Sequence, residues 1–336
     1  MRSSVLLSRL AILLVLLCGF GAACNAQVKE LRVARSDGLG YLPIILMEHF
    51  NLIEKQAKVA GLPAVKVTWA RFAGGVQMND SLLSGSLDFA SGGVPPFLTL
   101  WGRTAGTPQS VKAVCALAAY PYLLVSRNPN IKSIRDLTPK DRIVLPAVKV
   151  SIQAVLLQMA AAQAFGEANY AKLDPITVSL SNPDGLIALV TGKSEIIAHF
   201  SNPPFQYQEL RNPGFRTILH SYDVLGGPAT STLIWTTTKF HDDNPKLYAA
   251  FVAAFEEANA MIRSDKKSAV VLYKNVTKDT DTVENLLEMV NDMDFSPTPR
   301  NTMKFVEFMH KVGTLKTKAA TWKELFLPEI HDQPGS

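Results

Sequence analysis

The 336-residue sequence lacks the common motifs of enzyme chemistry. It contains no Gly-x-Ser-x-Gly elbow, no His-Glu-x-x-His, no Cys-x-x-Cys and no P-loop, which position nucleophiles, metals or phosphates in many enzymes. Its histidines also show no metal-ligand spacing, and they lie at His49, His199, His220, His241, His310 and His331. We therefore expect no catalytic centre, no metal site and no cofactor.

The sequence also lacks an apolar run long enough to span a bilayer, which takes roughly 20 residues. Near the N-terminus, Arg2 and Arg9 precede an apolar run from Leu10 to Phe20, and small residues follow through Ala26. This order is typical of a secretory signal. We expect residues 1–26 to be a signal peptide that is removed on export, which predicts a periplasmic protein.

Cysteine is scarce, with three residues in the chain. Cleavage after Ala26 would remove Cys18 and Cys24 and leave Cys115 alone, so no internal disulfide could form. Cys115 lies in an apolar, strand-like run and is expected to be a buried, inert thiol. The alternative for the N-terminus is a lipid anchor at Cys24, although Gly21 stands where a lipobox usually has leucine.

Charge of one sign is not in large excess. The formal net charge is +5, and it falls to +3 without the first 26 residues. That excess is too small to predict nucleic-acid binding. With 47% hydrophobic residues, a chain of this length can bury large cores and is too long for one ordinary domain.

Two segments of the sequence are related to each other. Residues 83–97 (LSGSLDFASGGVPPF) return in altered form as residues 190–205 (VTGKSEIIAHFSNPPF). In each, a helical pattern ends at a glycine, an acidic residue follows three positions later, and an apolar run and a polar turn lead into Pro-Pro-Phe. The pattern predicts a helix, a strand and a helix start, and a β-rich run precedes each copy at residues 65–69 and 176–180. This repetition predicts two similar α/β lobes.

The remaining elements predict where the chain passes between the lobes. Strands at residues 31–35, 111–118 and 122–125 would complete a first sheet of about five strands, and the turn residues 126–130 would end that lobe. A helix capped by Ser151 belongs to the second lobe, which ends with a strand at 215–219. The run 231–237 would pair back with the first lobe, and Asn244 would cap a long helix. We therefore expect lobe one at residues 27–126 plus 223–336, lobe two at 127–222, and a ligand cleft between them.

The candidate binding site lies in the loops after the strands, which line the ligand crevice of open α/β sheets. These loops are rich in glycine, serine and asparagine, and helix N-termini there carry partial positive charge, so they suit an anionic or strongly polar group. The alternative for each residue is helix capping or turn formation. The candidate ligand-binding residues are Gly38, Gly40, Tyr41, Gly74, Gly75, Gln77, Gly92, Gly93, Tyr120, Ser151, Gln153, Asn182, Asp184, His199, Ser201 and Asn202.

Several motifs, in this order, resemble a known family. They are residues 40–44 (GYLPI), 72–77 (FAGGVQ), both related segments, and 134–137 (IRDL). Together they resemble the periplasmic solute-binding proteins of aliphatic sulfonate, nitrate and taurine ABC importers, a family that includes binders of a thiamine pyrimidine precursor. The resemblance implies an α/β, two-lobed type II periplasmic binding protein fold that closes on a small solute and delivers it to a membrane permease. It also implies a monomer.

The sequence departs from that family at two positions that bear on the ligand. Val94 stands where an acidic residue often precedes the first Pro-Pro, and Ser201-Asn202-Pro203 stands where Trp-Asp-Pro is common. Without these carboxylates a ligand ammonium loses a partner, so we expect an anionic or neutral, sulfonate-like solute. The alternatives are an extracytoplasmic sensor for a signalling partner, or an enzyme on the same fold.

Overall fold

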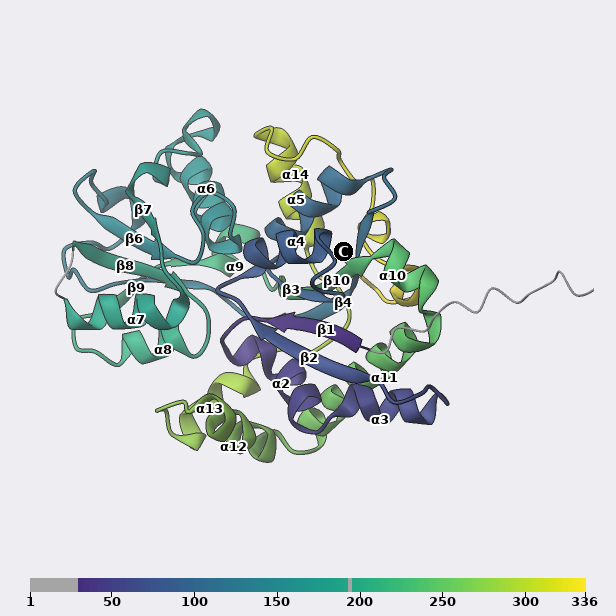
Figure 1. Cartoon of the computed structure of the whole chain (residues 1–336). Helices are drawn as coiled ribbons and strands as arrows, with labels where there is room; N and C mark the ends of the chain where they lie inside the picture. The colour runs from purple at the N-terminus through teal and green to yellow at the C-terminus, as the bar shows by residue number, and fades with distance from the viewer. Residues whose placement is uncertain (1–29, 193–194) are drawn as a thin grey trace, which may run out of the picture.

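The computed structural model describes residues 30–192 and 195–336 (Figure 1). The predicted signal peptide, its cleavage after Ala26 and the alternative lipid anchor at Cys24 lie outside these residues. Within the two described ranges, no helix is both long enough and apolar enough to cross a membrane. Figure 1 shows two groups of strands, each with its own helices.

The first lobe contains two small sheets side by side. Strand β1 (Glu30–Arg35) pairs in parallel with β2 (Lys66–Arg71), and β10 (Thr230–Thr237) runs antiparallel between β3 (Ala90–Gly92) and β4 (Val111–Ala119). A bridge between Val33 and Phe89 joins the two sheets. The prediction that residues 231–237 pair back with the first lobe is confirmed.

Helices cover these sheets because their apolar faces are buried on them. The helices of the first part of the lobe are α2 (Leu42–His49), α3 (Leu52–Val59), α4 (Gly75–Leu83) and α5 (Val94–Thr104). Those of the C-terminal part are α10 (Thr238–Asp243), α11 (Pro245–Ser264), α12 (Lys266–Thr277), α13 (Val283–Asn291) and α14 (Thr302–Lys311). In α11 the apolar residues Leu247, Phe251, Phe255, Ala258 and Ile262 are buried, and Phe251 stacks on Phe89 with ring centroids 3.8 Å apart.

Asn244 precedes α11 but does not cap it. Its Nδ2 donates instead to the carbonyl of Phe240, at 3.2 Å, in the last turn of α10. The predicted cap is therefore wrong, because α10 ends where α11 begins and a carbonyl of α10 accepts the hydrogen bond of the Asn244 side chain. Short 3-10 turns complete the lobes at η1 (Leu39–Tyr41), η2 (Ile134–Asp136), η3 (Glu167–Asn169), η4 (Asp174–Ile176), η5 (Trp322–Glu324) and η6 (Pro328–Ile330).

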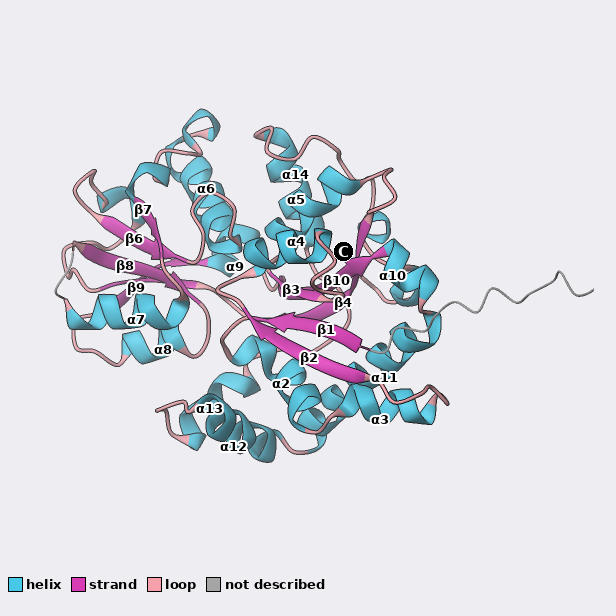
Figure 2. Cartoon of the chain, in the orientation of Figure 1, coloured by secondary structure: helices cyan, strands magenta, loops and turns pink. Residues whose placement is uncertain are grey.

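The second lobe is built on one five-stranded sheet. Its order is β7 (Thr177–Ser179), β6 (Arg142–Leu145), β8 (Ile196–Ser201), β5 (Leu123–Ser126) and β9 (Arg216–His220). Figure 2 shows this sheet between α6 (Ile152–Phe165) on one side and α7 (Asn182–Thr191) and α8 (Phe205–Leu210) on the other. Strand β6 is parallel to both its neighbours, whereas β5 is antiparallel to β8 and β9.

The placement of residues 122–125 in the first sheet is wrong. They form most of β5, which pairs with β8 and β9 in the second lobe. The chain crosses between the lobes at Tyr120–Tyr122, ahead of the predicted crossing at residues 126–130. A run of four apolar residues does not reveal its pairing partners, and Pro121 has no N–H with which to extend the β4 ladder. The predicted boundary at residues 222 and 223, where the chain returns from lobe two to lobe one, stays a prediction.

The return crossing runs through α9 (Ser221–Leu225) and is hydrogen-bonded to the outward one. The backbone N–H of Tyr120 donates to Ser231 Oγ at 2.9 Å, and Ser231 Oγ donates to the Tyr120 carbonyl at 2.5 Å. The backbone N–H of Tyr122 donates to Ser221 Oγ at 2.9 Å. Two serines therefore tie the crossing segments together.

The helix, strand and helix order predicted for the two related segments is confirmed. It appears as α4, β3 and α5 in the first lobe and as α7, β8 and α8 in the second. Gly85 and Gly192, which follow α4 and α7, have φ of 75° and 65°, where glycine is favoured. Pro95 and Pro96 lie in the first turn of α5, but the second pair of prolines precedes α8.

Cys115 is a free thiol on β4 and is buried, as predicted. Burial raises the pKa of this thiol far above its usual range, which keeps it protonated and unreactive.

Candidate functional site

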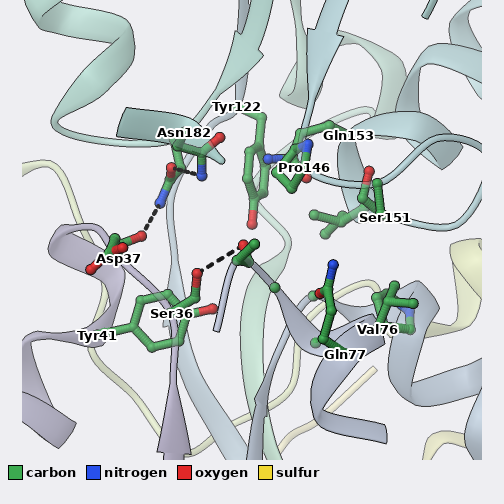
Figure 3. A pocket seen from close by; sticks show the side chains of 18 of the residues that line it. Ser36, Asp37, Tyr41, Val76, Gln77, Tyr122, Pro146, Ser151, Gln153 and Asn182 are labelled. Carbon is green, nitrogen blue, oxygen red and sulfur yellow. Dashed lines mark hydrogen bonds between the residues drawn. The ribbon is translucent and has the colours of Figure 1, made fainter. Parts of the chain in front are cut away.

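A cavity of about 40 Å³ lies where the two lobes meet (Figure 3). First-lobe residues from the loops after β1, β2 and β3 face second-lobe residues from the loops after β6, β7 and β8, with two tyrosines of the crossing between them. The lining residues are Ser36, Asp37, Tyr41, Ala73, Gly74, Gly75, Val76, Gln77, Gly93, Pro96, Tyr120, Tyr122, Pro146, Ala147, Ser151, Ile152, Gln153, Asn182 and Asn202.

Four helices begin at this cavity, two from each lobe. Gly74 and Gly93 precede α4 and α5, and Ser151 caps α6 by accepting the N–H of Ala154 at 3.2 Å. Asn182 is the first residue of α7. The first N–H groups of a helix have no partner within it and carry partial positive charge. The arrangement therefore suits a solute with several acceptor oxygens.

The side chains that line the cavity supply little net charge. Asp37 is the one carboxylate among the lining residues of the described chain, and it is paired with Arg71. Burial raises the pKa of Tyr41 well above its usual range and that of Tyr120 to about 12, so both hydroxyls stay neutral. Recognition of an anion here would depend on helix N-termini and neutral donors.

Direct hydrogen bonds join the lobes beside the cavity. Asn202 Nδ2 donates to the Asp37 carbonyl at 3.3 Å, and the backbone N–H of Leu39 donates to the Pro203 carbonyl at 2.9 Å. Gly38 is required between them, because a Cβ there would lie 2.2 Å from Asn202 Nδ2 and its φ is 127°. The lobes are therefore in close contact around the site.

The orientation of the Asn202 amide follows from this contact. A backbone carbonyl only accepts, so Asn202 must present Nδ2 to Asp37 and Oδ1 to Asn182, whose Nδ2 donates to it at 2.6 Å. Figure 3 draws these two hydrogen bonds as dashed lines next to the labelled Asn182 and Asp37. Asn182 Oδ1 is left buried without a hydrogen-bond partner among the described residues.

Two tyrosines from the outward crossing form the back of the cavity. Tyr122 donates its hydroxyl to the Ser231 carbonyl at 3.2 Å, and the Tyr120 hydroxyl lies 3.3 Å from that of Tyr122. Gly40 packs directly on the Tyr120 ring, since a Cβ there would lie 2.4 Å from it. The wall of the cavity is thus continuous with the hinge between the lobes.

Ten of the sixteen predicted site residues line the cavity. They are Tyr41, Gly74, Gly75, Gln77, Gly93, Tyr120, Ser151, Gln153, Asn182 and Asn202. Gly38, Gly40 and Gly92 do not line it but stand behind lining residues, where each allows close packing. That the ten residues contact a ligand stays a prediction.

The structure places the other three candidates, Asp184, His199 and Ser201, away from the cavity. Asp184 accepts a hydrogen bond from Ser181 Oγ at 2.5 Å, at the start of α7. His199 and Ser201 lie on the face of β8 that packs under α7 and α8, and both bond to Glu209. Side chains alternate along a strand, so only Asn202, just past its end, turns to the cavity.

Sequence reasoning missed nine lining residues. Five of them are next to predicted candidates or separated from one by a single residue, namely Ser36, Asp37, Ala73, Val76 and Ile152. Pro96 is in the first turn of α5, and Pro146 and Ala147 directly follow β6, a position that the rule of strand ends could have identified. Tyr122 was missed because the crossing was placed too late in the chain.

Comparison with known proteins agrees with this geometry. No family model matches the chain. The alkanesulfonate-binding protein of Xanthomonas axonopodis, solved with bound MOPS, superposes with a TM-score of 0.69 at 16% identity, covering 86% of this chain and 95% of that one. The chain has the periplasmic binding protein fold. The fold predicted from the sequence is confirmed.

Other proteins with this fold, and one relative in sequence, resemble the chain. The nitrate-binding protein of Synechocystis superposes with a TM-score of 0.67 at 12% identity, covering 89% of this chain and 85% of that one. A putative aliphatic sulfonates-binding protein of Escherichia coli is 25% identical over 262 residues, which are 75% of this chain and 73% of the relative. The resemblance to sulfonate- and nitrate-binding proteins is thereby confirmed.

Proposed function

We propose that this chain is the extracytoplasmic substrate-binding component of an ABC importer. It captures a small polar or anionic organic solute, sulfonate-like in its head group, and delivers it to a permease in the membrane. The observation that supports this most directly is the meeting of four helix N-termini, from both lobes, at one cavity whose lining has little net charge. Such N-termini bind oxyanions without a charged side chain.

The names of the similar proteins support the same role. They are binding proteins for alkanesulfonates and nitrate, both of which present several oxygens to a site. From these names we also propose a periplasmic location and a permease partner for this chain. The transport cycle then needs no covalent step, because the protein only binds the solute, closes on it and releases it.

Closure would act through the two crossings. A solute that contacts both lobes stabilises the arrangement in which they meet, since it binds that arrangement better than an open one. The hydrogen bonds from Asn202 to Asp37 and from Leu39 to Pro203 form only when the lobes are together. They would therefore form as the solute is enclosed.

A thermal-shift screen of the purified protein tests the proposal. The panel contains sulfonates, taurine, nitrate, carboxylates and pyrimidines. A ligand present at about 100 times its dissociation constant adds roughly 2.7 kcal/mol to the free energy of unfolding. We expect one class with an oxyanion head group to raise the unfolding temperature and to be recovered chemically unchanged. A panel without any shift, or conversion of the bound compound, would contradict the proposal.

Asn202→Ala should weaken binding of the compound found in that screen by roughly tenfold, because it removes two hydrogen bonds worth about 0.5–1.5 kcal/mol each. Ser151→Ala should also weaken it, through loss of the α6 cap. Calorimetry measures both affinities. Asn212→Ala is the matched control, since Asn212 also makes two bonds in the second lobe but does not line the cavity. Unchanged affinity in both site variants would refute the placement of the site.

A further inference from the structure

Beside two of the helix starts, Gly93 of the first lobe and Ile152 of the second are in contact. Gly93 precedes α5 of the first lobe, and Ile152 is the first residue of α6 of the second. A Cβ at Gly93 would lie 2.7 Å from Ile152 Cβ and 2.8 Å from its Cγ2. Both residues line the cavity. The side chain of Ile152 therefore already occupies the space next to Gly93.

Glycine is present at position 93 for space and not for backbone freedom. Its φ of −66° and ψ of 158° are extended values that any residue adopts. Alanine could take the same backbone conformation, but its methyl group would overlap Ile152 at the present separation of the lobes. The pair thus limits how closely α5 and α6 approach.

The volume left inside is small. About 40 Å³ is far below the roughly 300–1,000 Å³ of pockets that take drug-sized ligands. The cavity therefore suits an oxyanion head group with a short chain, such as methanesulfonate, better than a longer alkanesulfonate.

The walls leave little room for a longer solute. Pro96 and Pro146 present rigid rings, and Tyr122 is buried and hydrogen-bonded to Ser231. Ile152 is 5% exposed and closes the side nearest Gly93. Of these residues, Ile152 is the one whose shortening would enlarge the cavity without removing a hydrogen bond or a proline.

We propose that the contact between Gly93 and Ile152 sets the degree of lobe closure and thereby restricts the site to short-chain solutes. This inference rests on the proposed function, because it concerns the solute bound at the same site. Ile152 acts as the specificity-determining residue, and Gly93 provides the space that lets the lobes meet over the solute.

Calorimetry with methane-, ethane-, propane- and butanesulfonate tests the size limit, or with formate to butyrate if the screen selects carboxylates. We expect the wild type to bind the shortest sulfonates best and to lose tenfold or more in affinity by butanesulfonate. Ile152→Ala should move the preference to longer chains. Ile143→Ala is the control, since Ile143 is a buried isoleucine of the same lobe outside the cavity lining. If Ile152→Ala fails to fold, Ile152→Val should give a smaller change in the same direction.

A double variant tests the contact itself. Gly93→Ala should weaken binding of the best ligand by tenfold or more, because its methyl group holds the lobes apart, while the unfolding temperature without ligand stays unchanged. Adding Ile152→Ala should restore most of the lost affinity, since it removes the atoms that the methyl group meets. Without such restoration, the contact does not set closure and the inference fails.

The outcomes separate the inference from the proposed function. Equal affinity across the chain-length series, or tight binding of a pyrimidine by the wild type, would overturn the size limit and leave a solute receptor in place. Selective binding of nitrate or methanesulfonate would support both. Failure of every compound in the panel would contradict the proposed function and the size limit with it.

Discussion

His199 and Glu209 form a buried pair behind the cavity. His199 Nδ1 lies 2.5 Å from Glu209 Oε1, both side chains are fully buried, and Ser201 Oγ donates to the other carboxylate oxygen at 3.4 Å. Desolvation raises the pKa of Glu209, and the histidine opposes that rise. His199 lies on β8 three residues before Asn202, and Glu209 lies on α8, so the pair holds the end of β8 from which Asn202 reaches the first lobe.

His199→Phe should lower the free energy of unfolding by about 3–5 kcal/mol near neutral pH, because it leaves a buried carboxylate without its partner. The folded state then holds Glu209 with a pKa above the ordinary value of 4.5, so it binds a proton more tightly than the unfolded chain. The loss should be smallest near pH 4.5 and should grow as pH rises through the folded pKa.

Urea unfolding of the variant and the wild type across pH 4.5–8 measures this difference. The exposed His49 gives the control substitution His49→Phe, which should change stability little at any pH. A loss for His199→Phe that does not vary with pH would assign the effect to packing and not to the unpaired carboxylate.

At this scale the sequence predicts which loops meet, but not which side chains within them face the solute. His199 is a candidate because it lies at the end of a predicted strand, and Ser201 and Asn202 are candidates because they lie in the predicted loop after it. Whether a strand residue faces the cavity or the covering helix alternates from one residue to the next. An error of one residue in the predicted alternation along β8 therefore places His199 on the cavity side when it faces the covering helices. The apolar run does not show which alternation is correct.

Among the elements, the alternation of helices and strands is well predicted and strand pairing is not. The order of α4, β3 and α5 follows from local signals, namely the C-terminal glycines and the apolar runs. The position of β5 in the second sheet depends on contacts with β8 and β9, which lie more than 60 residues away in the chain. The local sequence of β5 therefore does not predict which strands it pairs with.

Ser231→Ala should loosen the crossing, because it leaves the N–H and carbonyl of Tyr120 without their partner. An unpaired buried group costs about 1–3 kcal/mol, and affinity should fall roughly threefold to tenfold because Tyr120 lines the cavity. Denaturant unfolding and calorimetry measure the two effects.

The matched control is Thr236→Val, which removes a buried hydroxyl from the same strand. Thr236 Oγ1 donates to the Asp88 carbonyl at 2.7 Å, far from the crossing. It should lower stability by a similar amount and leave affinity unchanged. Equal losses of affinity in the two variants would show that the crossing has no special role in binding.

In the whole molecule, the lobes also meet at a surface outside the cavity. Lys311 of α14 pairs with Glu167, the first residue of η3 in the second lobe, and the Tyr170 and Phe308 rings pack edge to face with centroids 6.2 Å apart. Both charged side chains are mostly exposed, so the pair is weak and sensitive to salt. It nevertheless forms only when the lobes are together, and it adds to the stability of that arrangement.

Reversing one charge should therefore lower affinity for the solute without any change in the cavity. Glu167→Lys should weaken binding by up to about fivefold at low salt, since exposed pairs contribute about 0.2–1 kcal/mol. The exchange Glu167→Lys with Lys311→Glu should restore it, and 1 M salt should remove the difference. Calorimetry at two salt concentrations measures this.

Lys239→Glu is the control for that experiment, because Lys239 pairs with Asp243 inside α10 and joins no lobes. It should leave affinity unchanged. An exchanged pair that fails to recover wild-type affinity would contradict a contribution of this surface to closure.

The central place of β10 has a consequence for the order in which the protein is completed. This strand fills the gap between β3 and β4, yet it follows the entire second lobe in the chain. A polypeptide that emerges N-terminus first carries β3 and β4 without the strand that joins them until β10 has been made, after α9. The five strands of the second lobe are uninterrupted by the first, so that sheet can assemble as a unit. The lobe whose synthesis begins first is the last to be finished.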